Sequence, residues 1–204
     1  RAVPQDDQEG NGSMREIVCT GFMSLDGVVD SPGGGAGEDH RSAGWVFKDI
    51  EFRPEAFALK SEELAETSAL MFGKRSYAAF APYWRESDDH AAYKDLPKYV
   101  VSSTITEDEV LDGWGETTIL RSTDDVAKLR ESDGGAIFIH GSAELARRLS
   151  DAGLIDRYHL LVFPLLLGAG KSIFSDADRD KQMLRLRESA GYPNGIVKLI
   201  YDVV

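Results

Sequence analysis

The sequence predicts one α/β domain in which helices flank a mixed, mostly parallel sheet. Short β-rich runs alternate with helical patterns from Met14 onward, and several of these runs lead through a glycine turn directly into a helix. This alternation is typical of parallel strands joined by helices. The last three β-rich runs have no helix between them, which indicates antiparallel strands at one edge of the sheet. Neither a repeat nor an interdomain linker interrupts 14–204, so a single domain accounts for this range.

The first third of the domain is expected to contain a strand, a long loop and a helix. The strand is predicted over 16–22, and the loop over 24–53 includes a Ser-Pro-Gly-Gly-Gly turn at 31–35. The helix is predicted over 54–67, where apolar residues recur at helical spacing and Pro54 suits the first turn. A structureless loop of this length is often a lid or a binding loop, so we expect function near it.

The rest of the domain is expected to alternate strands and helices and then to end in strands alone. The strands are predicted over 69–72, 99–102, 117–120, 136–139, 158–163, 183–189 and 196–203. The helices are predicted to begin near Lys74, to run over 88–93, to begin at Thr123 as the N-cap, and to run over 143–149. Asp124 and Asp125 favour the third of these helices because carboxylates stabilise a first turn.

The composition is that of an ordinary globular protein with an acidic charge balance. Hydrophobic residues make up 42% and charged residues 28% of the 204 residues, and the formal net charge is −12. Non-specific binding to the phosphates of DNA or RNA requires clustered Lys and Arg, so we expect no nucleic-acid partner. Any anionic ligand must then be held by local groups.

Residues 1–13 and the single cysteine bear on the location of the protein. Residues 1–13 are polar and lack an apolar segment, so we exclude them from the fold as a disordered leader or an added tail. Cys19 alone cannot form an intramolecular disulfide, which fits a reducing compartment. Because no run of about 18 apolar residues occurs, we expect no membrane span and a cytoplasmic protein.

Two familiar phosphate-binding motifs fail when they are tested against the sequence. Gly170-Lys171-Ser172 ends like a P-loop, but the glycine that the motif requires is replaced by Leu165. Gly168-Ala169-Gly170 begins like a Rossmann fingerprint, but its third glycine would fall on Ile173.

Two other junctions between a strand and a helix retain the physics of anion binding. Gly73-Lys74-Arg75-Ser76 opens a helix with two cations, and His140-Gly141-Ser142 opens another with a glycine that permits close backbone approach. Free N–H groups and the helix dipole attract anions at both places. The alternatives remain open here, since first-turn cations are usually only solvated and Gly-Ser is usually only a cap.

Several motifs, in a fixed order, identify the relatives of this chain. They are Ser-Leu-Asp-Gly at 24–27, Leu-Met-Phe-Gly-Lys-Arg-Ser-Tyr at 70–77, Pro-Lys-Tyr-Val-Val-Ser-Ser-Thr at 97–104, Gly-Ser at 141–142 and Pro-Leu-Leu-Leu-Gly-Ala-Gly-Lys at 164–171. The chain resembles the reductase domain of the bifunctional riboflavin-biosynthesis deaminase-reductase and the stand-alone dihydrofolate-reductase-like proteins related to it. The resemblance spans roughly 15–203 and implies a dihydrofolate-reductase-like fold, NADPH as cofactor and a homodimer.

The resemblance also implies a role for each junction. Arg75 would meet the 2′-phosphate of NADPH, for which the guanidinium fork is well suited. The segment 102–104 would line the adenosine groove, and 141–144 would wrap the pyrophosphate. The implied cofactor residues are Gly73, Lys74, Arg75, Ser76, Ser102, Ser103, Thr104, His140, Gly141, Ser142, Ala143 and Glu144.

Departures from the family pattern leave the substrate open. The family commonly has Gly-Gly-Ser where this chain has His140-Gly141-Ser142, and often Asp-Glu where it has Asp156-Arg157. The riboflavin-pathway enzymes tend to carry a basic residue where Val28 stands and an Asp-x-Pro segment that 80–84 does not reproduce. A ribosylamino-pyrimidine-like substrate is one expectation among several small heterocycles.

The candidate residues for chemistry lie near the long loop. Asp26, at the end of the first strand, is the candidate catalytic residue for a polar contact or proton relay, although Asp-Gly is also a strong turn pair. Trp45 is the candidate for covering a flat substrate, although a loop Trp often belongs to the core, and Phe163 is a further candidate for substrate binding. The four histidines have no metal-site spacing, so we predict no metal.

Two alternative functions stay open. Dihydrofolate reduction would need an acid on the helix after the loop, for which Glu55, Glu62 and Glu63 are the candidates. A catalytically idle nucleotide-binding or dimerisation module would bind NADPH without oxidising it.

Overall fold

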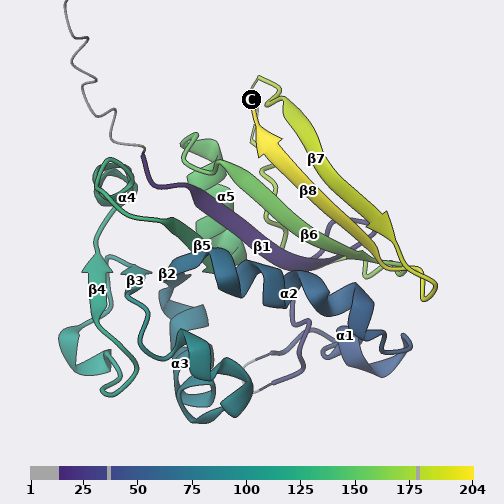
Figure 1. Cartoon of the computed structure of the whole chain (residues 1–204), viewed down its shortest axis with the longest axis horizontal. Helices are drawn as coiled ribbons and strands as arrows, with labels where there is room; N and C mark the ends of the chain where they lie inside the picture. Colours follow the sequence, from purple (N-terminus) through teal and green to yellow (C-terminus); the bar gives the residue numbers. More distant parts are fainter. Residues whose placement is uncertain (1–13, 36–37, 178–179) are drawn as a thin grey trace, which may run out of the picture.

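One sheet of eight strands organises the whole domain (Figure 1). The computed structural model describes residues 14–35, 38–177 and 180–204, and the predicted leader 1–13 lies outside them. The sheet order is β4-β3-β2-β5-β1-β6-β8-β7. The strands are β1 Ile17–Ser24, β2 Thr67–Gly73, β3 Lys98–Val101, β4 Thr117–Leu120, β5 Ala136–His140, β6 Arg157–Phe163, β7 Leu184–Gly191 and β8 Val197–Val203.

Strand direction confirms the predicted mixed sheet. The strands from β4 to β6 run parallel to one another. β8 is antiparallel to both β6 and β7, so the antiparallel part lies at one edge, as the helix-free C-terminal strands predicted. Parallel strands need a crossover connection, whereas antiparallel strands can be joined by a tight turn, and this explains the change at the C-terminal end.

Helices cover both faces of the sheet (Figure 1). They are α1 Trp45–Lys48, α2 Pro54–Glu66, α3 Lys74–Glu86, α4 Thr123–Arg130 and α5 Ala143–Asp151, with two 3-10 helices, η1 Asp88–Tyr93 and η2 Glu107–Glu109. Apolar residues of α4 and α5 pack on one face in a single cluster. On the other face, α2 and α3 pack in two separate clusters. No helix in the described part of the chain is long and apolar enough to cross a membrane.

Two helical predictions need correction. The helix predicted over 88–93 is the 3-10 helix η1. The N-cap of α4 is Ser122 rather than Thr123: the Ser122 side chain accepts from the Asp125 backbone N–H, and the Asp125 side chain accepts from the Ser122 N–H. This reciprocal capping box satisfies two donors at once, which a cap one residue later would not do.

The predicted long loop is held along much of its length by a second loop. It contains the short helix α1, and its first half runs beside 165–171. Backbone N–H groups of Leu25 and Val29 donate to carbonyls of Leu165 and Lys171, at 3.0 and 2.8 Å. His40 Nε2 lies 2.8 Å from the carbonyl oxygen of Ala169. The prediction of a structureless loop is therefore corrected by α1, and these contacts fix the loop against the body of the domain.

Candidate functional site

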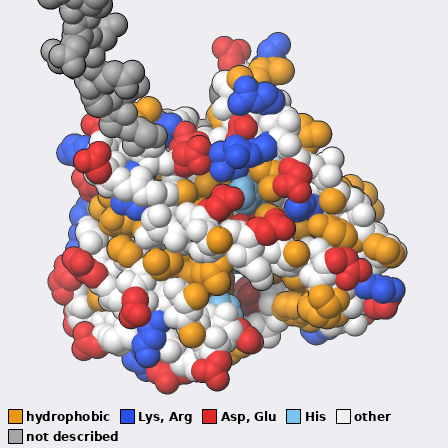
Figure 2. Space-filling model, viewed as in Figure 1, with side chains coloured by type: hydrophobic (Ala, Val, Ile, Leu, Met, Phe, Trp, Pro, Cys, Tyr) orange, Lys and Arg blue, Asp and Glu red, His pale blue; other side chains and the backbone are white. Residues whose placement is uncertain are grey.

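A large cleft opens at the carboxyl ends of β2, β3 and β5, between α2 and α3. Its volume is about 1430 Å³, and Figure 2 shows the surface hollowed on the face that carries these helices. Every residue predicted to hold a cofactor lines this cleft: Gly73, Lys74, Arg75, Ser76, Ser102, Ser103, Thr104, His140, Gly141, Ser142, Ala143 and Glu144. The fold thus brings together segments that lie far apart in the sequence.

The two predicted junctions are bonded to each other inside the cleft. The Gly73 N–H donates to Ser142 Oγ, and the Ser142 N–H donates to Ser76 Oγ, both at 2.9 Å. Gly141 and Ser142 adopt consecutive left-handed conformations, with φ of 59° and 57°. A Cβ on Gly141 would also lie 2.9 Å from the Phe80 ring, so the position requires glycine. The beginnings of α3 and α5 therefore form one continuous wall.

The charges on this wall are available to an anion. Arg75 and Arg148 are exposed cleft residues, and no carboxylate in the described ranges forms an ion pair with either. Lys74, by contrast, is already paired with Glu109 at 2.8 Å. The first N–H groups of α3 and α5 add the positive ends of two helix dipoles. Arg75 is thus the cation at the α3 junction that is free for a phosphate.

A tight turn after β3 forms a third wall of the cleft. Ser102 Oγ accepts from the N–H groups of Thr104 and Ile105, each at 3.1 Å. Arg121 clamps the same turn by donating to the carbonyls of Ser102 and Ile105, at 3.3 and 2.6 Å. This fixed turn is the segment predicted for the adenosine groove.

A buried polar network lies under the cleft and was not predicted. Glu63, on α2, is 1% exposed. Its Oε1 accepts from Thr20 Oγ1 at 2.5 Å and lies 3.2 Å from His159 Nδ1, while its Oε2 accepts from Lys60 Nζ at 3.1 Å. Burial opposes ionisation, but the Lys60 cation and these hydrogen bonds outweigh it and lower the pKa of Glu63 to about 2. Glu63 is therefore a carboxylate whose oxygens are already bound within the protein.

Strand register builds this network. β1 lies between β5 and β6, and Thr20 stands opposite His140 on one side and His159 on the other. Thr20 and His159 lie within strands of mostly apolar residues, and His140 ends the apolar strand β5. That interruption is the signal from which the network could have been found, because polar side chains inside a sheet need partners.

Aromatic side chains of α3 and η1 line the cleft beside the beginning of α5. The Trp84 ring stacks on Phe80 and Tyr93, with centroids 5.1 and 5.4 Å apart. His140 lies edge-on to Trp84 at 5.3 Å, and its Nε2 is buried without a hydrogen-bond partner. Burial lowers the pKa of His140 to about 4, so its ring is neutral at neutral pH.

Comparison with known proteins decides the family. The model of the family described as the RibD C-terminal domain matches residues 15–198. The chain belongs to the RibD C-terminal domain family. This confirms the resemblance drawn from the motifs.

Relatives of this RibD C-terminal domain agree with the fold. Protein YyaP of Bacillus subtilis strain 168, named as uncharacterized, is 24% identical over 198 residues, which are 94% of this chain and 96% of YyaP. A Shewanella sp. PV-4 protein named for a proposed part in riboflavin biosynthesis is 19% identical with a TM-score of 0.67, covering 93% of this chain and 99% of its own. Dihydrofolate reductase of Enterococcus faecalis, solved with NADP(H), is 12% identical with a TM-score of 0.58, covering 92% and 96%. The dihydrofolate-reductase-like fold is thereby confirmed.

The structure places the candidate catalytic residue of this RibD C-terminal domain outside the cleft lining. Asp26 accepts from Ser24 Oγ at 2.6 Å and from the N–H groups of Gly168 and Leu167 at 2.7 and 3.1 Å. These hydrogen bonds lower the pKa of Asp26 to about 2. An ionised carboxylate with these partners holds the two loops together, which gives Asp26 a structural role.

The two predicted substrate-covering residues lie in the core. Trp45 is 2% and Phe163 0% exposed, and their rings pack edge to face with centroids 5.2 Å apart. Trp45 Nε1 donates to the Asp30 carbonyl at 2.8 Å, so its polar atom is also satisfied. Neither side chain lines the cleft, and the expectation that they cover a substrate is corrected.

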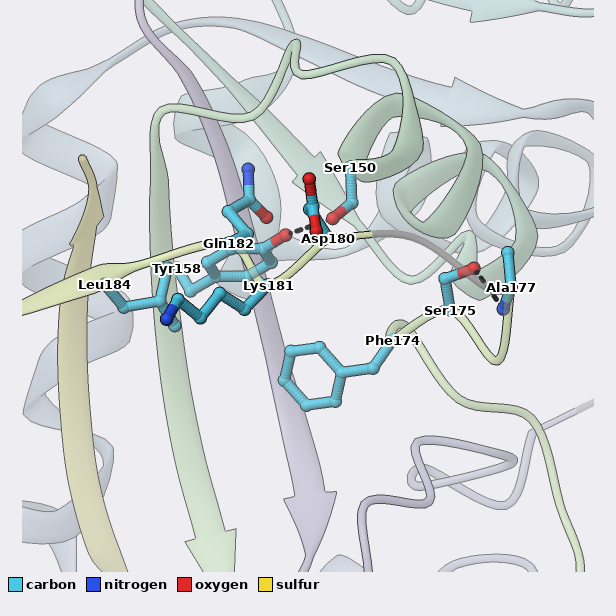
Figure 3. A pocket seen from close by; sticks show the side chains of 9 residues that line it. All are labelled: Ser150, Tyr158, Phe174, Ser175, Ala177, Asp180, Lys181, Gln182 and Leu184. Atoms are coloured by element: carbon cyan, nitrogen blue, oxygen red, sulfur yellow. Dashed lines mark hydrogen bonds between the residues drawn. The ribbon is translucent and has the colours of Figure 1, made fainter.

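Other possible sites are smaller or absent from the described part. A pocket of about 290 Å³ lies on the α5 face beside β6, where Tyr158 and Ser150 meet in a hydrogen bond of 2.8 Å (Figure 3). It contains none of the predicted cofactor residues. Within residues 14–35, 38–177 and 180–204, no group of three or more His, Cys, Asp or Glu side chains is placed to hold a metal ion.

Proposed function

We propose that the protein is an NADPH-dependent reductase of the riboflavin-pathway type. It would transfer a hydride to a small heterocyclic or ribosylamino-pyrimidine-like substrate. Membership in the RibD C-terminal domain family supports this class. The observation that carries the proposal is that all residues predicted for the cofactor, from three separate segments, line one cleft. We also place the reductase in the cytoplasm, in keeping with its single unpaired cysteine.

The residues of the cleft suit a phosphorylated dinucleotide. Arg75 would bind the 2′-phosphate, the N–H groups at the beginning of α5 would bind the pyrophosphate, and the turn 102–104 would hold the adenosine. Gly141 is exposed in the cleft, so its backbone is accessible to a phosphate oxygen. NADPH, when bound, supplies the hydride. The protein orients the two reactants and excludes water between them.

The neighbouring cations Arg75 and Lys74 differ in that only Lys74 is already paired with a carboxylate, and this difference provides a test. Arg75→Ala is expected to weaken NADPH binding by about tenfold or more, the effect of losing a charge-assisted hydrogen bond, and to leave NADH binding almost unchanged. Lys74→Ala is the comparison variant, and it is expected to weaken NADPH binding less than Arg75→Ala, because Lys74 is already paired with Glu109. Binding is measured by fluorescence titration with both coenzymes. Equal losses for NADPH and NADH in Arg75→Ala, or no binding of either coenzyme by the wild type, would overturn the proposal.

The two alternatives predict other outcomes. Dihydrofolate reduction needs an acid that meets the substrate, but Glu63 is bonded internally and Glu55 and Glu62 are exposed outside the cleft lining. Inhibition by an antifolate at low concentration would favour that alternative. An idle module would bind NADPH but oxidise it with no member of a panel of imines and carbonyls.

We further propose that the reductase forms a homodimer through its antiparallel edge. β7 is an edge strand whose side chains are mostly exposed, including Leu184 and Leu186 at 38% and 50% (Figure 1). Unpaired edge strands with apolar side chains favour pairing with another chain. Sedimentation is expected to give a dimer that Leu186→Lys dissociates, and a species of 22.4 kDa alone at micromolar concentration would reject this.

A further inference from the structure

A lysine on the α2 side of the cleft has one hydrogen-bond donor to spare. Lys60 Nζ donates to Thr20 Oγ1 at 2.6 Å and to Glu63 Oε2 at 3.1 Å. An ammonium group carries three donors, so one remains without a partner among the described residues. The side chain is 26% exposed, lines the cleft, and lies over the Phe22 ring at 5.1 Å. Lys60 is thus fixed in place and still able to bind a ligand.

The carboxylate beside Lys60 does not offer the same opportunity. Both oxygens of Glu63 accept hydrogen bonds from protein groups, and the residue does not line the cleft. The network therefore presents a donor and a positive charge to the cleft, and keeps its negative charge underneath. A ligand group placed here must accept a hydrogen bond.

A second polar group at the same place lacks a partner. His140 Nε2 is buried and unpaired, and His140 is the cross-strand neighbour of Thr20, to which Lys60 donates. Buried polar atoms are rarely left without a hydrogen bond. Trp84 lies beside His140 in an aromatic cluster with Phe80, His90 and Tyr93, and all of these residues line the cleft.

We propose that Lys60 is the substrate-anchoring residue of the cleft, and that it binds an oxygen acceptor, a carboxylate or carbonyl group, on a planar ring that lies beside the aromatic cluster containing Trp84. Lys60 contacts the oxygen, while Glu63 and Thr20 are positioning residues that hold the ammonium. The assignment of this half of the cleft to the substrate rests on the proposed reductase function. In this site, hydrogen-bond donation by Lys60 determines which substrates bind.

Two probes of the same shape and opposite hydrogen-bonding character test this site. Benzoate carries only acceptors on its planar ring, and benzamidinium carries only donors. Trp84 is the tryptophan that lines the cleft, since Trp45 and Trp114 are 2% and 0% exposed, so quenching of tryptophan fluorescence reports binding. Benzoate is expected to bind and to quench, with benzamidinium at least about tenfold weaker, as a lost charge-assisted hydrogen bond implies.

Variants of the lysine locate the effect. Lys60→Met is expected to weaken benzoate binding about tenfold or more, and Lys60→Arg to restore most of it. Lys128→Met, on the exposed surface of α4, is the matched control and is expected to bind benzoate normally. Circular dichroism and ligand-observed NMR on each variant separate loss of binding from loss of folding.

The outcomes separate this inference from the proposed function. Equal binding of the two probes, preference for benzamidinium, or unchanged benzoate affinity in a folded Lys60→Met protein overturns the anchoring site, whether or not NADPH binds. Benzoate binding that depends on Lys60 supports the site even if NADPH titration fails, in which case only the reductase function is lost.

Discussion

The two faces of the sheet are built on opposite principles. On the α4 and α5 face, apolar side chains of every central strand join one continuous cluster that includes Cys19 and Leu149. On the α2 and α3 face, two apolar clusters are separated, and the network of Glu63, Lys60 and Thr20 lies near the cleft between the helices. The first face stabilises the fold by burial. The second face has no continuous apolar cluster, and in its place has a cleft with the buried carboxylate of Glu63 beneath it.

The largest expected effect tests whether the split face depends on its buried charge. Glu63→Ala is expected to destabilise the protein by about 3–5 kcal/mol, because it leaves Lys60 and His159 without their shared partner. Urea unfolding at neutral pH measures this. Glu62→Gln on the same helix is the control and should change stability little, since Glu62 is 54% exposed and 3.8 Å from Lys198. A Glu63→Ala cost no larger than that of the control would contradict the role of the network.

The pH dependence gives a second test of Glu63. Its pKa in the folded protein, about 2, is below the ordinary value of 4.5, so the ionised form stabilises the fold. This stabilisation is complete above the ordinary value and is lost as the pH falls from there toward 2. The difference in unfolding free energy between wild type and Glu63→Gln should therefore shrink as the pH is lowered from about 5 to about 3, because Glu63 in the unfolded chain takes up a proton in this range. A constant difference over this range would show that Glu63 is not the responsible group.

A cavity on the continuous face should change stability without changing the site. Leu149→Ala removes a side chain that is 0% exposed and is expected to cost about 2–5 kcal/mol. Because Leu149 lies toward the end of α5 distant from Ser142, coenzyme affinity should stay within about twofold of the wild type. Denaturant unfolding and NADPH titration on the same preparation check both parts. A loss of NADPH affinity as large as that in Arg75→Ala would break the separation between the two faces.

A smaller effect is expected at the junction itself. Gly141→Ala forces a side chain into a left-handed conformation and against the Phe80 ring, at an expected cost of about 1–3 kcal/mol. It should also weaken NADPH binding. Gly153→Ala is the matched control, since Gly153 has a similar φ of 68° but open space around its Cβ. NADPH affinity should be lower in the first variant only, and equal affinities would remove the junction from the binding site.

The smallest expected effect concerns the loop contact of Asp26. Asp26→Asn should leave NADPH binding and turnover unchanged but speed proteolytic cleavage within 24–35, because it weakens acceptance from the Gly168 and Leu167 N–H groups. Asp39→Asn, at an exposed position nearby, should cleave like the wild type. A large loss of turnover in Asp26→Asn would restore the catalytic role that the geometry argues against.

Sequence patterns predicted the elements well because the signals are local. The strand predicted over 117–120 is β4, and the helix predicted over 143–149 is the main part of α5. The cap of α4 was displaced by one residue because Ser122 and Thr123 offer equivalent hydroxyl groups, and only backbone geometry distinguishes them. The two anion-binding junctions, at 73–76 and 140–142, could be predicted from general rules for the beginnings of helices.

The missed features depend on partners that are distant in sequence. Glu63 meets Thr20 and His159 across separations of 43 and 96 residues, and no helical pattern shows that a carboxylate on α2 will be buried. Trp45 was misassigned for the same reason, since an aromatic residue in a loop carries no indication of which way it points. Long-range register, set by the position of β1 between β5 and β6, decides the first case, and packing against Phe163 of β6 decides the second.

The bonds between Ser142 and the residues Gly73 and Ser76 have a kinetic consequence. Because each junction is tied to the other, the anion-binding wall is assembled before any ligand arrives. A dinucleotide entering the cleft would not have to order this wall, so little conformational entropy opposes its association there. Association at this end should then show one fast phase in stopped-flow traces, and slow steps would arise where the substrate docks.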